Sequence, residues 1–229
     1  MFLSTIEPST LLWEAAGVTG AVIFYGRFYV QWIASERRGR SVMPVVFWYM
    51  SGAGSVVLLL YGVFYQHSPV GALSHCFNSV IYARNLVHIW RERGVLTRRL
   101  SLLFHGSVAL FILAGVAMVA ATWLHEYHQT RGGAPGEAAR AWLWIGVGVA
   151  GQALFAGRFI LQWAATEMKK RSVVPPAFWY LSVAASLLLM ASHLQRMEWV
   201  YAAGLVGTLV VYVRNIHLIR AGRGADAGE

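Results

Sequence analysis

The sequence has few charged residues and one cysteine. Only 13% of its 229 residues are charged, about half the share expected of a soluble domain, whereas 57% are hydrophobic. The single cysteine, Cys76, excludes an internal disulfide. Acidic residues are outnumbered, with 10 Asp+Glu against 19 Lys+Arg. The shortage of charge indicates an integral membrane protein.

Signatures of soluble enzymes and of metal sites are missing as well. The sequence contains no GxSxG, HExxH, P-loop or CxxC motif, and its histidines do not fall at metal-ligand spacing. Glu36 and Glu167 lie among basic residues at expected helix ends, where ion pairing is the expected role. We therefore expect no metal, no cofactor and no enzyme chemistry of these classes.

Long apolar stretches fill most of the chain, and a spanning helix needs about 20 residues. The predicted fold is an all-α integral membrane protein with seven transmembrane helices. These are expected at about 11–34, 42–65, 69–90, 100–124, 141–165, 173–195 and 198–219.

A segment of the sequence occurs twice. Residues 27–50 recur as 158–181 at an offset of 131, and the motif at Tyr82, Arg84 and Asn85 recurs at an offset of 130 as Tyr212, Arg214 and Asn215. The second copy begins four predicted helices after the first. Because four is an even number of crossings, both copies enter the membrane in the same orientation. The sequence predicts two parallel three-helix repeats joined by a linker helix, a 3+1+3 arrangement.

The predicted organisation has six parts. They are an external N-terminus (1–10), repeat 1 (11–90), the linker helix (100–124), an external loop rich in Gly and charge (125–140), repeat 2 (141–219) and a cytoplasmic tail (220–229).

Basic residues concentrate on one predicted side of the membrane. Twelve Lys and Arg lie in the loops after helices 1, 3 and 5 and in the tail, and three lie in the opposite loops. Short basic loops stay cytoplasmic, so the N-terminus is expected outside and the C-terminus inside. The net charge of +9 then indicates anionic membrane lipids as partners, and not nucleic acid.

Two arginines lie deep in predicted spans, each with a glutamine four residues later. These pairs are Arg27 with Gln31 and Arg158 with Gln162. An arginine at a helix centre costs about 2.5–3.5 kcal/mol on insertion scales. Snorkelling towards the interface is the structural alternative. The repeated glutamine on the same helix face favours binding of an anion.

Helices 3 and 7 carry a second polar stripe. Tyr82 and Asn85 share one face, as do Tyr212 and Asn215, and Arg84 and Arg214 lie beside them. This lower part is duplicated, whereas His75 and Asn78 above it become Leu205 and Thr208. The stripe would suit a site between the repeats. Hydrogen bonding between helices is the alternative.

Aromatic residues and prolines also recur in helices 2 and 6. Trp48 and Trp179 lie in FWY triplets that could stack on a ring or an isoprenoid chain. Pro44 and Pro175 are expected about one turn into these helices. They are candidate hinges, although proline is also tolerated in a first turn.

The string RFxxQWxASExxxRSVxPxxFWYxS, followed by YxRN, resembles the lipid A biosynthesis N-terminal domain family in both copies. Ser35 and Gly39 become Thr166 and Lys170 in the second copy. That family is distantly similar to PQ-loop and SWEET-type transporters, which have the same 3+1+3 arrangement. By this analogy Asn85 and Asn215 would face a substrate.

The resemblance implies a protein of the bacterial inner membrane that acts in lipid A or lipopolysaccharide biosynthesis. We expect a transporter or flippase for an anionic lipid-linked saccharide, such as a polyprenyl-phosphate sugar. The alternative is a non-transporting subunit that anchors a glycosyltransferase. Activity related to lipid-A-disaccharide synthase is the third possibility, although residues 1–229 contain no glycosyltransferase domain.

Overall fold

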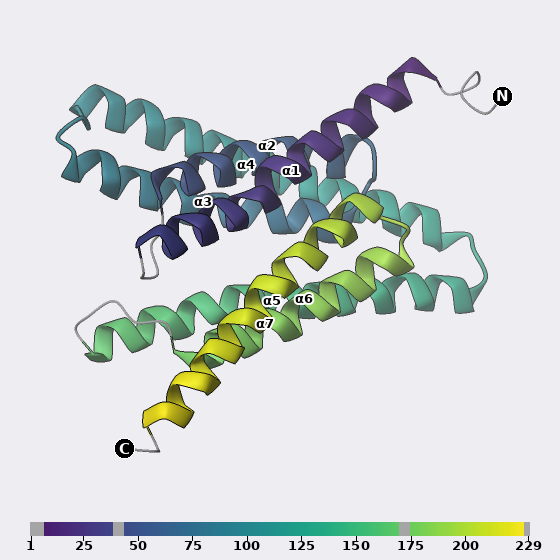
Figure 1. Ribbon diagram of the computed structural model, residues 1–229. Coiled ribbons are helices and arrows are strands. Elements are labelled where there is room, and N and C mark those ends of the chain that lie inside the picture. Colours follow the sequence, from purple (N-terminus) through teal and green to yellow (C-terminus); the bar gives the residue numbers. More distant parts are fainter. Residues whose placement is uncertain (1–6, 39–43, 170–174, 227–229) are drawn as a thin grey trace. The chain divides into compact units, whose positions relative to one another are not determined.

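The computed structural model describes residues 7–38, 44–169 and 175–226, and these form seven helices (Figure 1). Their bounds are α1 Pro8–Arg38, α2 Val45–Phe64, α3 Pro69–Glu92, α4 Arg98–Arg131, α5 Pro135–Lys169, α6 Pro176–Gln195 and α7 Trp199–Asp226. The helices group into two compact units, Met1–Ala134 and Pro135–Glu229, called unit 1 and unit 2 below. The basic residues Arg40, Lys170 and Arg171 of the topology prediction lie outside the described residues.

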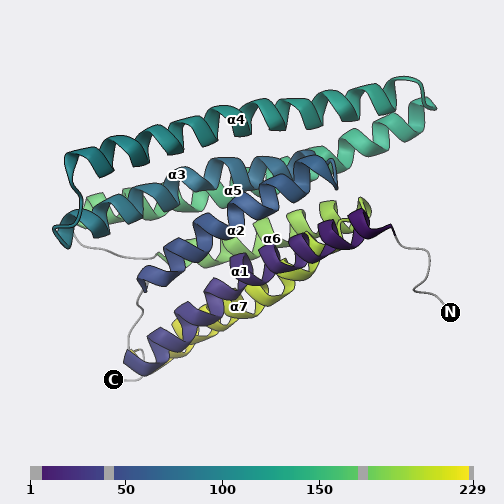
Figure 2. The ribbon, with the colours of Figure 1, turned by 90° about the horizontal axis from the view of Figure 1, so that it is seen from above.

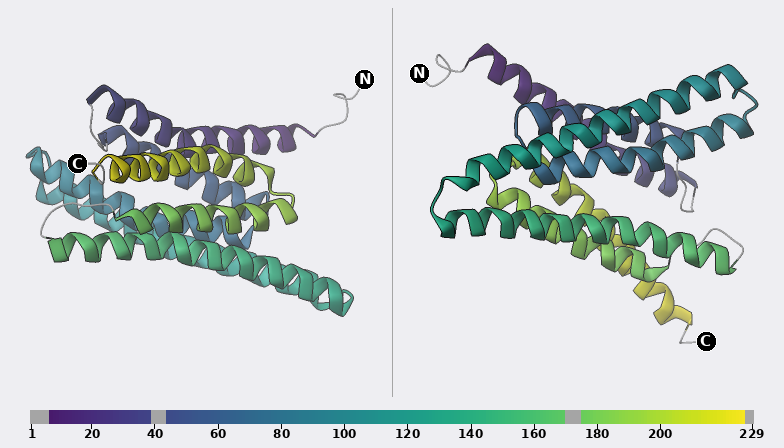
Figure 3. Two further views of the ribbon diagram at one scale, coloured as in Figure 1. Left: turned by 60° about the horizontal axis from the view of Figure 1, so that its bottom comes forward. Right: turned by 180° about the vertical axis from the view of Figure 1, so that it is seen from behind.

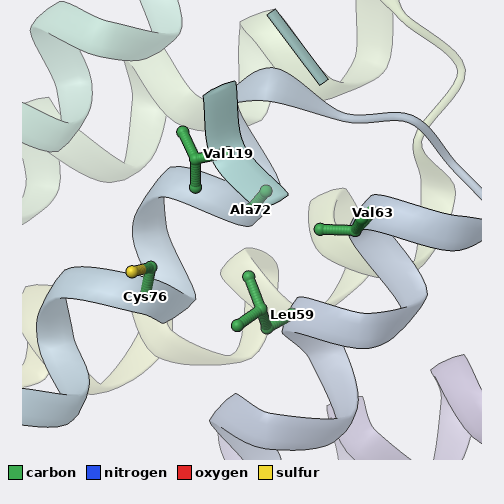
Figure 4. Close-up of a cluster of buried hydrophobic side chains, with 5 residues drawn as sticks. All are labelled: Leu59, Val63, Ala72, Cys76 and Val119. Atoms are coloured by element: carbon green, nitrogen blue, oxygen red, sulfur yellow. The ribbon is translucent and has the colours of Figure 1, made fainter. Parts of the chain in front are cut away.

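In unit 1, α2 packs against both α1 and α3, and α4 lies along α3 (Figure 2). Gly54 on α2 permits a close approach to α1, because a Cβ there would lie 2.8 Å from the Cα of Phe24. An apolar cluster ties α2, α3 and α4 together (Figure 4). Its buried members are Leu59, Val63, Ala72, Cys76 and Val119.

Unit 2 repeats the three-helix pattern, with α6 packed against both α5 and α7 (Figure 3). Gly151 brings α5 close to α6, since a Cβ at this position would lie 3.1 Å from the carbonyl oxygen of Ala185. Small residues let helix backbones approach closely in membrane proteins. The middle helix of each unit can therefore contact residues of both flanking helices.

Helices α4, α5 and α7 extend well beyond their predicted bounds. The loop predicted at 125–140 is wrong, because α4 continues to Arg131 and α5 begins at Pro135. Likewise, α7 continues to Asp226 through most of the predicted tail. Pro135 begins a helix, where its missing N–H costs nothing. Apolar composition ends before these helices do, because polar residues extend them.

Five helical segments of the described chain are long and apolar enough to cross a membrane, which supports a multi-pass protein. They are Val45–Phe64, Arg98–Arg131, Gly136–Gln162, Pro176–Gln195 and Trp199–His217. Helices α1 and α3 are 31 and 24 residues long but carry more polar side chains. Their crossing, and the orientation of the termini, stay predictions.

The prolines do not lie where the sequence analysis placed them. Pro44 and Pro175 have extended backbones, with ψ of 149° and 148°, and occupy the N-cap positions of α2 and α6. A residue at the N-cap precedes the first turn and breaks no hydrogen bond inside the helix. Their role as hinges stays a prediction, now for the junction before each helix.

Candidate functional site

Arg27 is buried in unit 1, where aromatic rings from three helices surround its guanidinium group. The side chain is 5% exposed. Its guanidinium carbon lies 3.6 Å from the ring centroid of Phe24 on α1, 5.2 Å from that of Phe47 on α2 and 5.0 Å from that of Tyr82 on α3. Arg27 therefore faces the interior of its unit and does not snorkel along the surface.

Arg158 occupies the equivalent place in unit 2 and is 6% exposed. Its guanidinium carbon lies 4.0 Å from the centroid of Phe155, 5.0 Å from that of Phe178 and 5.5 Å from that of Tyr212. Each ring is the repeat counterpart of a ring around Arg27. The duplication has thus preserved an arginine enclosed by aromatic rings, which we call the arginine cage of each unit.

The hydrogen bonds differ between the cages. Nη1 of Arg158 donates to Ser182 Oγ at 2.7 Å and to Tyr212 Oη at 3.3 Å. In unit 1, Nε and Nη1 of Arg27 have no hydrogen-bond partner within the described part of the chain. Ser51, the counterpart of Ser182, donates to the carbonyl oxygen of Phe47 at 2.6 Å.

The cage around Arg27 stabilises a positive charge without neutralising it. A desolvated cation–π contact contributes about 2 kcal/mol, so several rings offset part of the cost of burial. Rings attract the guanidinium through their faces, and hydrogen-bond acceptors approach through its N–H edge. No ion pair of Arg27 is present among the described residues. Its N–H edge can therefore donate hydrogen bonds to an anionic oxygen.

The predicted site residues are only partly brought together. The half-buried rings of Trp48 and Trp179 lie beside the cage tyrosines, with centroids 6.4 Å from Tyr82 and 6.1 Å from Tyr212. Arg84 is exposed. The remaining predicted residues are half-buried, namely Gln31, Asn85, Gln162, Arg214 and Asn215.

Both asparagines bond to their own helices. Nδ2 of Asn85 donates to the carbonyl oxygen of Ile81 at 2.8 Å, and Nδ2 of Asn215 donates to that of Val211 at 2.7 Å. Thr208 likewise donates to the carbonyl oxygen of Leu205 at 2.8 Å. For these amide and hydroxyl groups, the bonds found lie within one helix and do not join two helices.

Part of each cage was not predicted from the sequence. Phe24 and Phe155 lie three residues before the arginines at the same repeat offset, so extending the comparison by one helical turn would have found them. Ser51 and Ser182 were not among the predicted site residues. Ser55 and Ser186, one turn further, are fully buried, and their Oγ atoms have no hydrogen-bond partner among the described residues.

Comparison with known families agrees with the duplication. Residues 16–87 and 147–217 each match the Lipid A Biosynthesis N-terminal domain. The chain belongs to this family. Both matched segments contain an arginine cage, so the cage recurs in each copy of the family domain present here. The two copies confirm the predicted internal repeat.

Related proteins include lipid-A-disaccharide synthases of Chlamydia. The chain is 31% identical to that of Chlamydia trachomatis serovar D over 210 residues, and 30% identical to that of Chlamydia muridarum over the same length. In both cases the match covers 89% of this chain and 34% of the relative. The chain thus spans about a third of the length of these relatives. No solved structure matches it.

Proposed function

We propose that this membrane protein is a transporter or flippase for a phosphate-bearing, lipid-linked saccharide used in lipid A biosynthesis or modification. A polyprenyl-phosphate sugar in the bacterial inner membrane is the type of substrate meant. The observation that carries the proposal is the arginine cage, which places a buried cation in an equivalent setting in each unit.

Phosphate fits the chemistry of the cage. A guanidinium group can donate two parallel hydrogen bonds to a phosphate, and such charge-assisted bonds are about twice as strong as neutral ones. Arg27 has buried donors without a partner among the described residues, and buried donors normally have one. A phosphate oxygen would supply the missing acceptor and the opposite charge.

The surrounding polar and aromatic residues would bind the rest of the substrate. In this proposal Trp48 and Trp179 contact a sugar ring or the lipid chain, and Asn85 and Asn215 take the substrate-facing role of SWEET-type transporters. Both asparagines would have to exchange their bonds to the backbone for bonds to the substrate. Pro44 and Pro175 would allow α2 and α6 to tilt during transport.

A second candidate is a non-transporting subunit that anchors a glycosyltransferase. The relatives favour it, because they are named as synthases and the matched segment covers 34% of their length. In such a protein the basic residues on the predicted cytoplasmic side would contact the enzyme. This candidate requires no movement of substrate across the membrane.

Reconstitution into liposomes separates the two candidates. A polyprenyl-phosphate sugar with a fluorophore on the sugar is placed in both leaflets, and dithionite is added outside to quench accessible fluorophores. Transport predicts quenching beyond the outer-leaflet fraction with the wild type, and none beyond it with Arg27→Gln. Arg220→Gln is the matched control, because Arg220 bonds to the exposed Tyr180. If wild-type liposomes match protein-free ones, the transport proposal is wrong.

A further inference from the structure

A second polar feature of unit 2 lies away from its arginine cage. An open pocket of about 330 Å³ lies where α5 begins and α6 ends. It is lined by Glu137, Arg140, Ala141, Trp144, Gln195 and Arg196. Its volume falls near the lower end of the range for small-molecule sites, about 300–1,000 Å³.

Buried groups position one wall of this pocket. Nε of Arg196 donates to Oε1 of Glu198 at 3.0 Å, and the Glu198 side chain is 2% exposed. The other carboxylate oxygen lies 2.5 Å from Nδ1 of His193, whose ring stacks on Tyr201. A surface arginine held by a buried carboxylate keeps its orientation, because that carboxylate has little freedom to move.

The opposite wall is fixed by a bond between helices. Oγ of Ser192 on α6 donates to the carbonyl oxygen of Trp144 on α5 at 2.7 Å. This bond holds the backbone that carries Trp144 next to the end of α6. The pocket therefore stands on two joined helices, and sites built on rigid elements hold a ligand more precisely than sites on loops.

Unit 1 provides an internal comparison, because the repeat offset of 131 matches Trp144 to Trp13 and Arg196 to Tyr65. In unit 1 these two rings stack, with centroids 6.3 Å apart and an interplanar angle of 17°. Tyr65 Oη also donates to Glu14 Oε1 at 2.9 Å.

Aromatic packing thus occupies in unit 1 the place of the pocket in unit 2. Phe64, the counterpart of Gln195, also lies beside Trp13, with ring centroids 6.3 Å apart. In unit 2 a polar and a basic side chain replace Phe64 and Tyr65, and the tryptophan borders an open pocket. The second copy has thus exchanged aromatic packing for polar groups at this helix junction.

The charges around the pocket indicate which class of ligand it can bind. Arg140 and Arg196 are balanced by Glu137 and by Glu198 behind the wall, so the pocket has no strong excess of either sign. The side-chain amide of Gln195 can donate and accept hydrogen bonds, which suits the neighbouring hydroxyl groups of a sugar. The indole ring of Trp144 suits the C–H face of a pyranose. We propose that this pocket binds a saccharide ring. The proposal rests on residues of unit 2 alone and does not require transport.

The test measures sugar binding to the whole protein in lipid nanodiscs, free of sugar-headed detergent, by saturation-transfer difference NMR. The probes are methyl β-glucopyranoside, glucose 1-phosphate and glycerol 3-phosphate. A fourth probe, octyl β-glucopyranoside below its micelle concentration, distinguishes a lipid-borne sugar from a free one. We expect both soluble sugars to bind and glycerol 3-phosphate to bind at least about tenfold more weakly.

Variants that introduce the residues of unit 1 at the matching positions of unit 2 test whether the sugar binds in this pocket. Arg140→Ser introduces the residue of the matching position, Ser9, at an exposed site, so it leaves folding unchanged. The double variant Gln195→Phe with Arg196→Tyr fills the pocket. Each should weaken sugar binding at least about tenfold, while the exposed control Arg93→Gln should not. Glycerol 3-phosphate bound as tightly as the sugars, or sugar binding unchanged by Arg140→Ser, would overturn the saccharide assignment.

Discussion

Arg158 and Ser182 are joined by a hydrogen bond of 2.7 Å that links α5 to α6. The matching pair in unit 1, Arg27 and Ser51, is not bonded in the described part of the chain. The two cages therefore share their aromatic rings and differ in how the arginine is tethered. Because of this difference, substitutions in the two cages can distinguish a contribution to stability from a contribution to function.

Ser182→Ala should destabilise the protein more than Ser51→Ala. The bond that Ser182 accepts is charge-assisted, and such bonds contribute about 1.5–3 kcal/mol, whereas the bond of Ser51 to its own helix contributes about 1 kcal/mol or less. Unfolding of the two variants by denaturant in nanodiscs measures the difference. Equal losses of stability would show that the Arg158–Ser182 bond has no net effect.

Gly54→Ala should loosen unit 1 at its arginine cage. The new Cβ would lie 2.7 Å from Cβ and 2.8 Å from Cα of Phe24, and a backbone atom cannot move aside as a side-chain tip can. Overpacking of this kind costs about 1–3 kcal/mol. Gly52→Ala is the matched control, because no atom lies within 4 Å of its new Cβ. A melting temperature equally unaffected in both variants would contradict this close contact.

The predicted topology can be read from the accessibility of introduced cysteines. Gln129→Cys at the end of α4 should react with an impermeant maleimide from the periplasm, and Gly222→Cys near the end of α7 should react only after the membrane is opened. The native Cys76 is buried, so the wild type serves as the unlabelled control. Periplasmic labelling of Gly222→Cys would reverse the orientation of the chain.

Periodicity and duplication predicted most of the helices, because apolar runs of spanning length are long and regular. The main error was the loop at 125–140, where Gly132, Gly133 and Pro135 suggested a break of many residues. Only 132–134 separates α4 from α5. The composition of the sequence shows where the apolar residues end. A helix can continue past that point as long as its backbone hydrogen bonds are satisfied.

Duplication also identified both arginines, because a charge repeated at one offset stands out in an apolar sequence. The rings around them were harder to find, since a phenylalanine in a membrane helix has no distinguishing signal of its own. The pocket of unit 2 was missed for a different reason. Arg196 and Glu198 lie at positions where the repeats diverge, so the duplication gives no signal there.

The most direct measurement is transport by Arg27→Lys and Arg27→Gln in the liposome assay, paired with the melting temperature of each variant. Lysine keeps the charge but cannot make the bidentate phosphate contact, so both variants should abolish transport. Both should melt close to the wild type, because the described structure shows Arg27 making ring contacts but no hydrogen bond through Nε or Nη1. Full transport by Arg27→Gln, or a variant that fails to fold, would contradict the assignment of Arg27 to substrate phosphate.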